Sequence, residues 1–190
     1  MEIQGLLFDL DGTLIHTQEA NLEAYNFALM EFGLDISLEN FKLTNGVDSR
    51  QFLEEYFPEL TMAEINTIRE IKASVYHKFF SKTYLNLVLA NFIESAVGVK
   101  RLGIVTTGKK MNTIEILEYH KIRDKFDVII TGDDTLNPKP SPEPYLKAIE
   151  NIKVHPSQIL VFEDSQVGCE SAIAAGLNVF RVQTVNQDEK

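Results

Sequence analysis

Two aspartates, two residues apart, follow an apolar segment at the start of the chain. Residues 3–10 are short and apolar, which is typical of a buried parallel strand, and Asp9 and Asp11 stand at its polar end. Gly12 then permits a sharp turn. Two carboxylates this close repel one another unless a cation compensates them, and Mg²⁺ prefers carboxylate and phosphate oxygens. The spacing therefore indicates phosphoryl chemistry with Mg²⁺, although an isolated Asp-x-Asp is also compatible with a simple turn.

Three more predicted strands end in polar side chains. Residues 102–106, 127–131 and 159–162 have the apolar pattern of buried strands. In an open α/β sheet the carboxyl ends of parallel strands form the crevice where ligands bind, so the residues that follow these strands are expected to converge. The predicted site contains Asp9, Asp11, Thr106, Lys139, Glu163 and Asp164.

Four motifs in this order resemble those of the haloacid dehalogenase superfamily, in the β-phosphoglucomutase-like group of its phosphatase branch. Together they span nearly the whole chain, and the first and last are individually specific. The motifs are Asp9-Leu10-Asp11-Gly12-Thr13, the strand end at Thr106, Lys139 in Asn137-Pro138-Lys139-Pro140-Ser141-Pro142, and Phe162-Glu163-Asp164-Ser165-Gln166-Val167-Gly168.

The resemblance implies a phosphatase that works through a covalent intermediate. Asp9 would attack the phosphorus and form an aspartyl-phosphate. Asp11 would act as general acid and then as general base, which requires it to hold a proton that Asp9 lacks. Thr106 and the main-chain N–H of Thr107 would donate to phosphoryl oxygens, and Lys139 would place a positive charge between nucleophile and phosphate.

The resemblance also implies that Mg²⁺ is the cofactor. It would be held by Asp9, by the main-chain carbonyl of Asp11 and by Asp164, with Glu163 acting nearby through water. A structural role competes with the metal role, because Asp164 or Ser165 can cap a helix that runs to Ala175. Both roles can hold at once.

The segment between the first motif and the Thr106 strand reads almost entirely as helix. Its spacing predicts a helix over 19–32, and a capping box at Thr61 and Glu64 opens a long helix towards Phe80. We therefore expect an α/β fold with two parts. Residues 1–15 and 83–190 would form a Rossmann-like, three-layer parallel-sheet core, and residues 16–82 an inserted helical-bundle cap. Two chain crossings at the base of the cap would act as a hinge.

Substrate choice is expected to reside in this cap. The resemblance places substrate contacts at Thr17, at Arg50 in the loop 46–50, and at Lys72, although Arg50 and Lys72 are equally compatible with ordinary surface cations. Mutases of this group have histidine where this chain has Asn21, so the pattern favours hydrolysis over phosphosugar transfer. A β-phosphoglucomutase-like mutase stays the alternative. A phospho-accepting, receiver-like signalling protein is the non-enzymatic alternative.

Composition bounds the partners and the location. The 190 residues carry a formal net charge of −10, which argues against nucleic acid and anionic membranes. The expected partner is a small phosphorylated metabolite, and the oligomeric state is not readable. The chain starts directly into a predicted strand and has a single cysteine, Cys169, which cannot form an internal disulfide, so a cytoplasmic location is expected.

Overall fold

Five parallel strands form the centre of the structure, a computed structural model that describes residues 2–43 and 49–183. Their order across the sheet is β5-β4-β1-β6-β7, so the first strand lies in the middle. The strands are β1 (Gly5–Phe8), β4 (Arg101–Val105), β5 (Val128–Ile130), β6 (Ile159–Glu163) and β7 (Asn178–Arg181). The parallel α/β fold expected from the sequence is confirmed.

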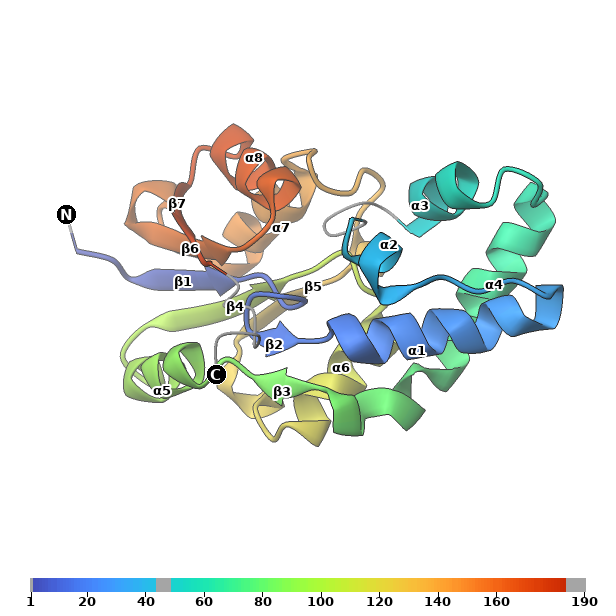
Figure 1. The fold of residues 1–190 in the computed structure, drawn as a ribbon. Coiled ribbons are helices and arrows are strands. Elements are labelled where there is room, and N and C mark those ends of the chain that lie inside the picture. The colour runs from blue at the N-terminus through green and yellow to red at the C-terminus, as the bar shows by residue number, and fades with distance from the viewer. Residues whose placement is uncertain (1, 44–48, 184–190) are drawn as a thin grey trace.

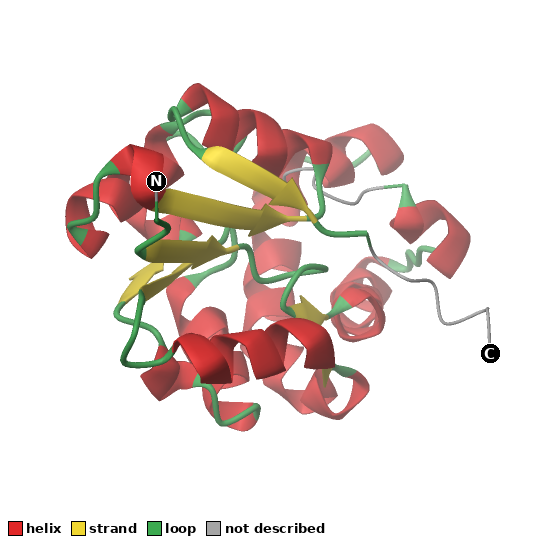
Figure 2. Cartoon of the chain, turned by 90° about the vertical axis from the view of Figure 1, so that its left-hand side faces the viewer, coloured by secondary structure: helices red, strands yellow, loops and turns green. Residues whose placement is uncertain are grey.

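Helices cover both faces of this sheet, as Figures 1 and 2 show. Alternate side chains of β1 point to opposite faces of the sheet, so Leu6 and Phe8 belong to one apolar cluster and Leu7 to the other. The first cluster includes α5 (Leu87–Ala96) and α6 (Lys110–Tyr119), and the second includes α7 (Glu143–Ile152) and α8 (Gln166–Ala174). The sheet is therefore the middle of three layers, as expected.

A group of helices lies beyond the carboxyl ends of the strands, at the right of Figure 1. A separate cluster of buried side chains, rich in phenylalanine, holds these helices together. The helices are α1 (Gln18–Leu29), α2 (Leu38–Lys42), α3 (Ser49–Tyr56) and α4 (Met62–Val75), followed by the 3₁₀ helix η2 (Tyr76–Lys82). The division into a core and a cap at residues 16 and 82 stays a prediction.

Local signals in this helical group are confirmed. Thr61 and Glu64 form the reciprocal capping box that opens α4. The first helix continues as a short 3₁₀ turn, η1 (Met30–Phe32), and stops at Gly33, whose φ is 70°. The second long helix changes at Tyr76 from α to 3₁₀ geometry, so it reaches the expected position of Phe80 in a different helical form.

Two short strands mark where the chain enters and leaves the helical group. They are β2 (Ile15–His16) and β3 (Tyr84–Leu85), and they pair antiparallel to each other. The rings of His16 and Tyr84 stack there with centroids 4.5 Å apart. The two chain crossings thus lie side by side, which is the arrangement that a hinge requires.

The strand β7 has no counterpart in the prediction. It lies at the sheet edge and only Val179 among its four residues is even half-buried, so its sequence lacks the apolar run that marks the central strands. None of the helices in the described ranges is long and apolar enough to cross a membrane.

Candidate active site

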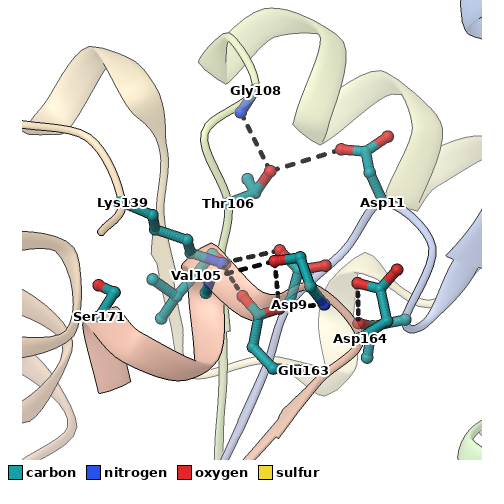
Figure 3. A network of polar contacts seen from close by, with 12 residues as sticks. Asp9, Asp11, Val105, Thr106, Gly108, Lys139, Glu163, Asp164 and Ser171 are labelled. Atoms are coloured by element: carbon teal, nitrogen blue, oxygen red, sulfur yellow. Dashed lines mark hydrogen bonds and ion pairs between the residues drawn. The ribbon is translucent and has the colours of Figure 1, made fainter. Parts of the chain in front are cut away.

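The carboxyl ends of β1, β4 and β6 meet at one end of the sheet, at the wall of a cavity of about 1060 Å³. Asp9 and Thr106 immediately follow their strands, and Glu163 is the last residue of β6; all three are buried. Asp11, Lys139 and Asp164 complete the group. The structure therefore brings together the six residues that the strand ends predicted (Figure 3).

Lys139 is the buried cation at the centre of this group. Its Nζ donates to Asp9 Oδ1 at 2.8 Å, to the Val105 carbonyl at 3.0 Å, and to Glu163 Oε1 (Figure 3). Burial alone would lower the pKa of Lys139, but the surrounding charges of Asp9, Tyr145 and Glu163 raise it well above its ordinary value. Lys139 is therefore a permanent positive charge beside Asp9.

Glu163 has little freedom to move. Its Oε1 also accepts from the Tyr145 hydroxyl at 3.1 Å, and its Oε2 accepts from Ser165 N at 3.2 Å and Ser165 Oγ at 3.1 Å. Gly168 lets α8 approach so closely that a Cβ at this position would lie 1.8 Å from Glu163 Oε1. Both oxygens of Glu163 are thus engaged by the protein, which suits an indirect, water-mediated contribution to a metal site.

Three buried carboxylates lie close enough together to surround one metal ion. Asp9, Glu163 and Asp164 each offer a carboxylate oxygen within 4.8 Å of the others. Burial raises the pKa of Asp9 well above its ordinary value, and the charges of Glu163 and Asp164 add to this against the opposing charge of Lys139. One ammonium leaves negative charge in excess, and a divalent cation would compensate it. The all-oxygen donor set fits Mg²⁺.

The turn after β1 brings the two aspartate motifs together. Gly12 has a φ of 92°, and a Cβ there would lie 2.4 Å from Asp164 Oδ2. Thr13 Oγ1 donates to Asp164 Oδ1 at 3.1 Å. Gly12 and Thr13 of the first motif therefore allow Asp164 of the fourth motif to pack closely against this turn.

Asp11 points away from the three carboxylates (Figure 3). Its Oδ1 accepts from Thr17 Oγ1 at 2.6 Å and from Asn21 Nδ2 at 3.5 Å, and its Oδ2 faces Thr106 Oγ1 at 3.5 Å. Thr106 Oγ1 in turn accepts from Gly108 N at 3.0 Å. The half-buried Asp11 carboxylate is thereby held at the cavity wall on the opposite side of Thr106 from Lys139.

Comparison with known proteins identifies the family. The sequence profile of the haloacid dehalogenase-like hydrolases matches residues 6–182. The chain belongs to this family. Protein CbbY of Rhodobacter capsulatus is 31% identical over 94% of this chain and 85% of its own. The fructose-1-phosphate phosphatase YqaB of Escherichia coli is 25% identical over 94% of this chain and 96% of its own.

A solved structure of the family has the same fold. The crystal structure of CbbY from Rhodobacter sphaeroides in complex with phosphate superposes with a TM-score of 0.84, at 26% identity over 98% of this chain and 90% of that one. The chain is therefore a haloacid dehalogenase-like hydrolase, as the sequence motifs implied.

Some of the residues predicted to bind substrate line the cavity of this hydrolase, and others do not. Thr17 and Lys72 line the cavity, and the Lys72 ammonium lies over the rings of Tyr76 at 4.1 Å and Tyr25 at 5.2 Å. Thr107 also lines it. Arg50 is exposed on α3 and is not among the described lining residues, and residues 46–48 of the predicted loop lie outside the described ranges. The substrate roles of these residues stay predictions.

Several cavity or site residues carry no sequence signal of their own. Tyr145 contacts Glu163 through its hydroxyl, yet along the sequence it reads as one more apolar position of α7. Arg69 lines the cavity with its Nε bonded to Ser49 Oγ at 2.8 Å. Asn112 and Tyr76 also line it. Only the packing of distant helices brings these side chains to the site.

Proposed function

We propose that this hydrolase is a Mg²⁺-dependent phosphatase that hydrolyses small organic phosphomonoesters through an aspartyl-phosphate on Asp9. The observation that carries the proposal is the position of Asp9, which lies buried at the cavity wall, bonded to the Lys139 ammonium and close to two further carboxylates. The relatives that bear a phosphatase name support the same reaction class. The cavity, with a volume of about 1060 Å³, has room for a small phosphorylated metabolite.

In the first half of the reaction, a carboxylate oxygen of Asp9 forms a bond to phosphorus while the bond to the leaving oxygen breaks. The leaving alkoxide takes the proton of Asp11, which Thr17 and Asn21 hold at the cavity wall. Thr106 Oγ1, the Thr107 main-chain N–H and Lys139 stabilise charge on the transferred group. The products are the aspartyl-phosphate and an alcohol.

In the second half, Asp11 is a carboxylate and takes a proton from water. The water oxygen bonds to phosphorus, the bond to Asp9 breaks, and inorganic phosphate leaves. Asp9, Asp164 and the main-chain carbonyl of Asp11 would hold Mg²⁺, with Glu163 acting through water. When bound, Mg²⁺ neutralises charge on the transferred phosphoryl group and lowers the repulsion between it and the nucleophile.

Two observations weigh against the alternatives. The mutases of this group have a histidine at the position of Asn21, which helps to hold back water attack until a sugar phosphate binds, whereas this chain has an asparagine whose amide contacts Asp11 and Thr17. A receiver-like protein needs no enclosed substrate space, whereas this cavity is lined jointly by the sheet end and by α1 and α4. Hydrolysis with turnover is therefore the favoured function.

Phosphate release from a panel of sugar and polyol phosphates, measured with Mg²⁺ and with a chelator, tests the proposal. Wild-type protein should turn over only with the metal, and Asp9→Asn should lower the rate by about 10⁴-fold or more. An acid-quenched single turnover should leave phosphate bound to wild-type protein and none on Asp9→Asn. Phosphate that stays on the protein without multiple turnovers would favour the receiver alternative. Transfer of the phosphate to a second hydroxyl of a sugar would favour the mutase.

A further inference from the structure

Two buried polar atoms stand out because the protein does not satisfy them. Among the described residues, the Tyr76 hydroxyl and Asn112 Oδ1 are the fully buried side-chain polar atoms that make no hydrogen bond. Tyr76 is 4% exposed and Asn112 is 7% exposed. A buried unpaired polar atom costs about 1 to 3 kcal/mol, and native proteins contain few of them. Their presence calls for a functional reason.

Both side chains belong to the wall of the same cavity, on opposite sides of a helix contact. Tyr76 begins η2 and Asn112 lies in the first turn of α6, and these two helices pack against each other. Both residues line the cavity that also contains Asp9 and Asp11. Both side chains form part of the cavity wall, so a ligand that fills the cavity contacts them.

The chemistry of the two atoms selects the kind of group that can pair with them. Asn112 Oδ1 only accepts hydrogen bonds, whereas the Tyr76 hydroxyl both donates and accepts. Burial and the charge of Asp11 raise the pKa of Tyr76 well above its ordinary value, against smaller opposing influences of the neighbouring Thr17 and Asn21 side chains, so its hydroxyl keeps its proton. A ligand hydroxyl can donate to Asn112 and accept from Tyr76. A carboxylate or phosphate has no proton to offer Asn112.

We propose that Asn112 and Tyr76 form a hydroxyl-binding subsite for the leaving group of the substrate, and that this hydrolase selects phosphate esters of polyhydroxylated alcohols. Esters whose leaving group is a plain alkyl chain leave both atoms unpaired, and esters that end in a carboxylate leave Asn112 Oδ1 unpaired, so both kinds are poorer substrates. A site built to bond a substrate hydroxyl discriminates strongly against an analogue that lacks it. This inference rests on the proposed phosphatase function and specifies its substrate class.

Three five-carbon esters test the subsite: xylitol 5-phosphate, n-pentyl phosphate and 5-(phosphonooxy)pentanoate. Wild-type protein should show a kcat/KM for the xylitol ester at least about 10-fold above that for the other two. Asn112→Leu and Tyr76→Phe should each reduce this ratio by about 10-fold. Equal wild-type activity on the three esters, or a preference for the carboxylate ester, would overturn the inference.

Stability separates a ligand-binding role from a structural one. Asn112→Leu removes an unpaired group, so its Tm should equal or exceed that of the wild type. The matched control is Asn26→Leu, since the Asn26 amide bonds the main chain of Ile36 at both ends, at 2.8 and 3.0 Å. This control should lose Tm and keep the wild-type ester ratio. A Tm loss in Asn112→Leu as large as that of the control, or an equal fall of its activity on all esters, would contradict the inference.

Binding to the Asp9→Asn variant tests the subsite without turnover. Calorimetry should show the xylitol ester binding about 10-fold more tightly than the pentyl ester, and Asn112→Leu in the same background should remove that difference. Absence of phosphate release by wild-type protein, with this binding preference intact, would refute the phosphatase proposal and leave the hydroxyl subsite standing. Equal binding of the two esters would refute the subsite alone.

Discussion

Lys139 and Asp9 lie 130 residues apart in the sequence, and in the fold Lys139 Nζ donates to Asp9 Oδ1 at 2.8 Å. The same ammonium contacts Glu163, so one cation serves two buried carboxylates. Removing one partner of a buried ion pair is costly because it leaves an uncompensated charge. This contact therefore links the stability of the protein to the site in which we place its chemistry.

Lys139→Met is expected to destabilise the protein by about 3 to 5 kcal/mol at pH 7. Its loss of stability should diminish as the pH falls towards 5. Lys139 opposes the burial that raises the folded-state pKa of Asp9, so this pKa is higher still in the variant, and the variant gains more stability than the wild type as pH falls. Urea unfolding at several pH values measures the effect.

Lys100→Met is the control for this substitution. Lys100 Nζ donates to the Ile3 carbonyl at 2.7 Å and forms no ion pair among the described residues, so its loss should cost about 1 kcal/mol without the same pH dependence. Equal losses in the two variants would show that the buried charge at Lys139 has no special role.

Thr17→Val removes the shortest hydrogen bond to Asp11. Thr17 Oγ1 lies 2.6 Å from Asp11 Oδ1, and without it the carboxyl group is free to leave the position of a general acid. We expect kcat to fall by about 10- to 100-fold with little change in KM. Thr67→Val, which deletes an exposed hydroxyl bonded to the Ala63 carbonyl, should leave both constants unchanged. A rise in KM alone would assign Thr17 to substrate binding.

The central strands and the motif residues could be predicted because each signal is local. The apolar run, the two aspartates and Gly12 are neighbours in the sequence. The rule that the carboxyl ends of parallel strands lie at one edge of the sheet then predicts which residues meet in space. The same reasoning reaches Lys139 only through its resemblance to a family motif, since no local pattern brings this loop back to β1. The predicted roles of these residues stay predictions.

The residues that were missed depend on packing between distant elements. Tyr145 reaches Glu163 only because α7 and α8 cover one face of the sheet, and Asn112 meets the cavity only because α6 packs against η2. At position 50 the motif match drew attention to Arg50, whereas the arginine that lines the cavity among the described residues is Arg69 on the next helix. The Ser49 hydroxyl accepts a hydrogen bond from Arg69 Nε and so orients this arginine, and the spacing of residues along the sequence does not reveal that contact.

Gly168→Ala should disrupt the site despite its conservative chemistry. The added Cβ would lie 1.8 Å from Glu163 Oε1, and Glu163 is fully buried and held by Lys139, Tyr145 and Ser165. We expect a loss of about 2 kcal/mol or more in unfolding free energy, together with most of the phosphatase activity.

The control is Gly98→Ala, where a Cβ meets no atom within 4 Å and only the φ of 75° opposes alanine. Its cost should be about 1 kcal/mol, with activity retained. If Gly168→Ala were no more harmful than this control, Glu163 would have to be more mobile than its contacts indicate.

Lys72 should make substrate affinity sensitive to pH near 8. Burial lowers the pKa of Lys72 to about 8, against a smaller opposing influence of Asp11. Below that pH the ammonium attracts an anionic substrate, and above it the neutral amine does not, so the KM of the wild type should rise by several-fold between pH 7 and pH 9.5. Lys72→Met should give a high KM that is nearly constant over this range.

Lys72 should also change the stability of the folded protein over a defined pH range. Its pKa is lower in the folded protein than the ordinary 10.5, so the unfolded chain binds the extra proton between about pH 8 and 10.5, and wild-type stability gains from Lys72 as pH rises through that interval. Lys72→Met should lack this gain. Lys78→Met, which removes an exposed lysine 5.5 Å from the Phe27 ring and outside the cavity lining, should keep both the pH-dependent KM and the gain in stability. A flat KM in the wild type would remove Lys72 from the substrate site.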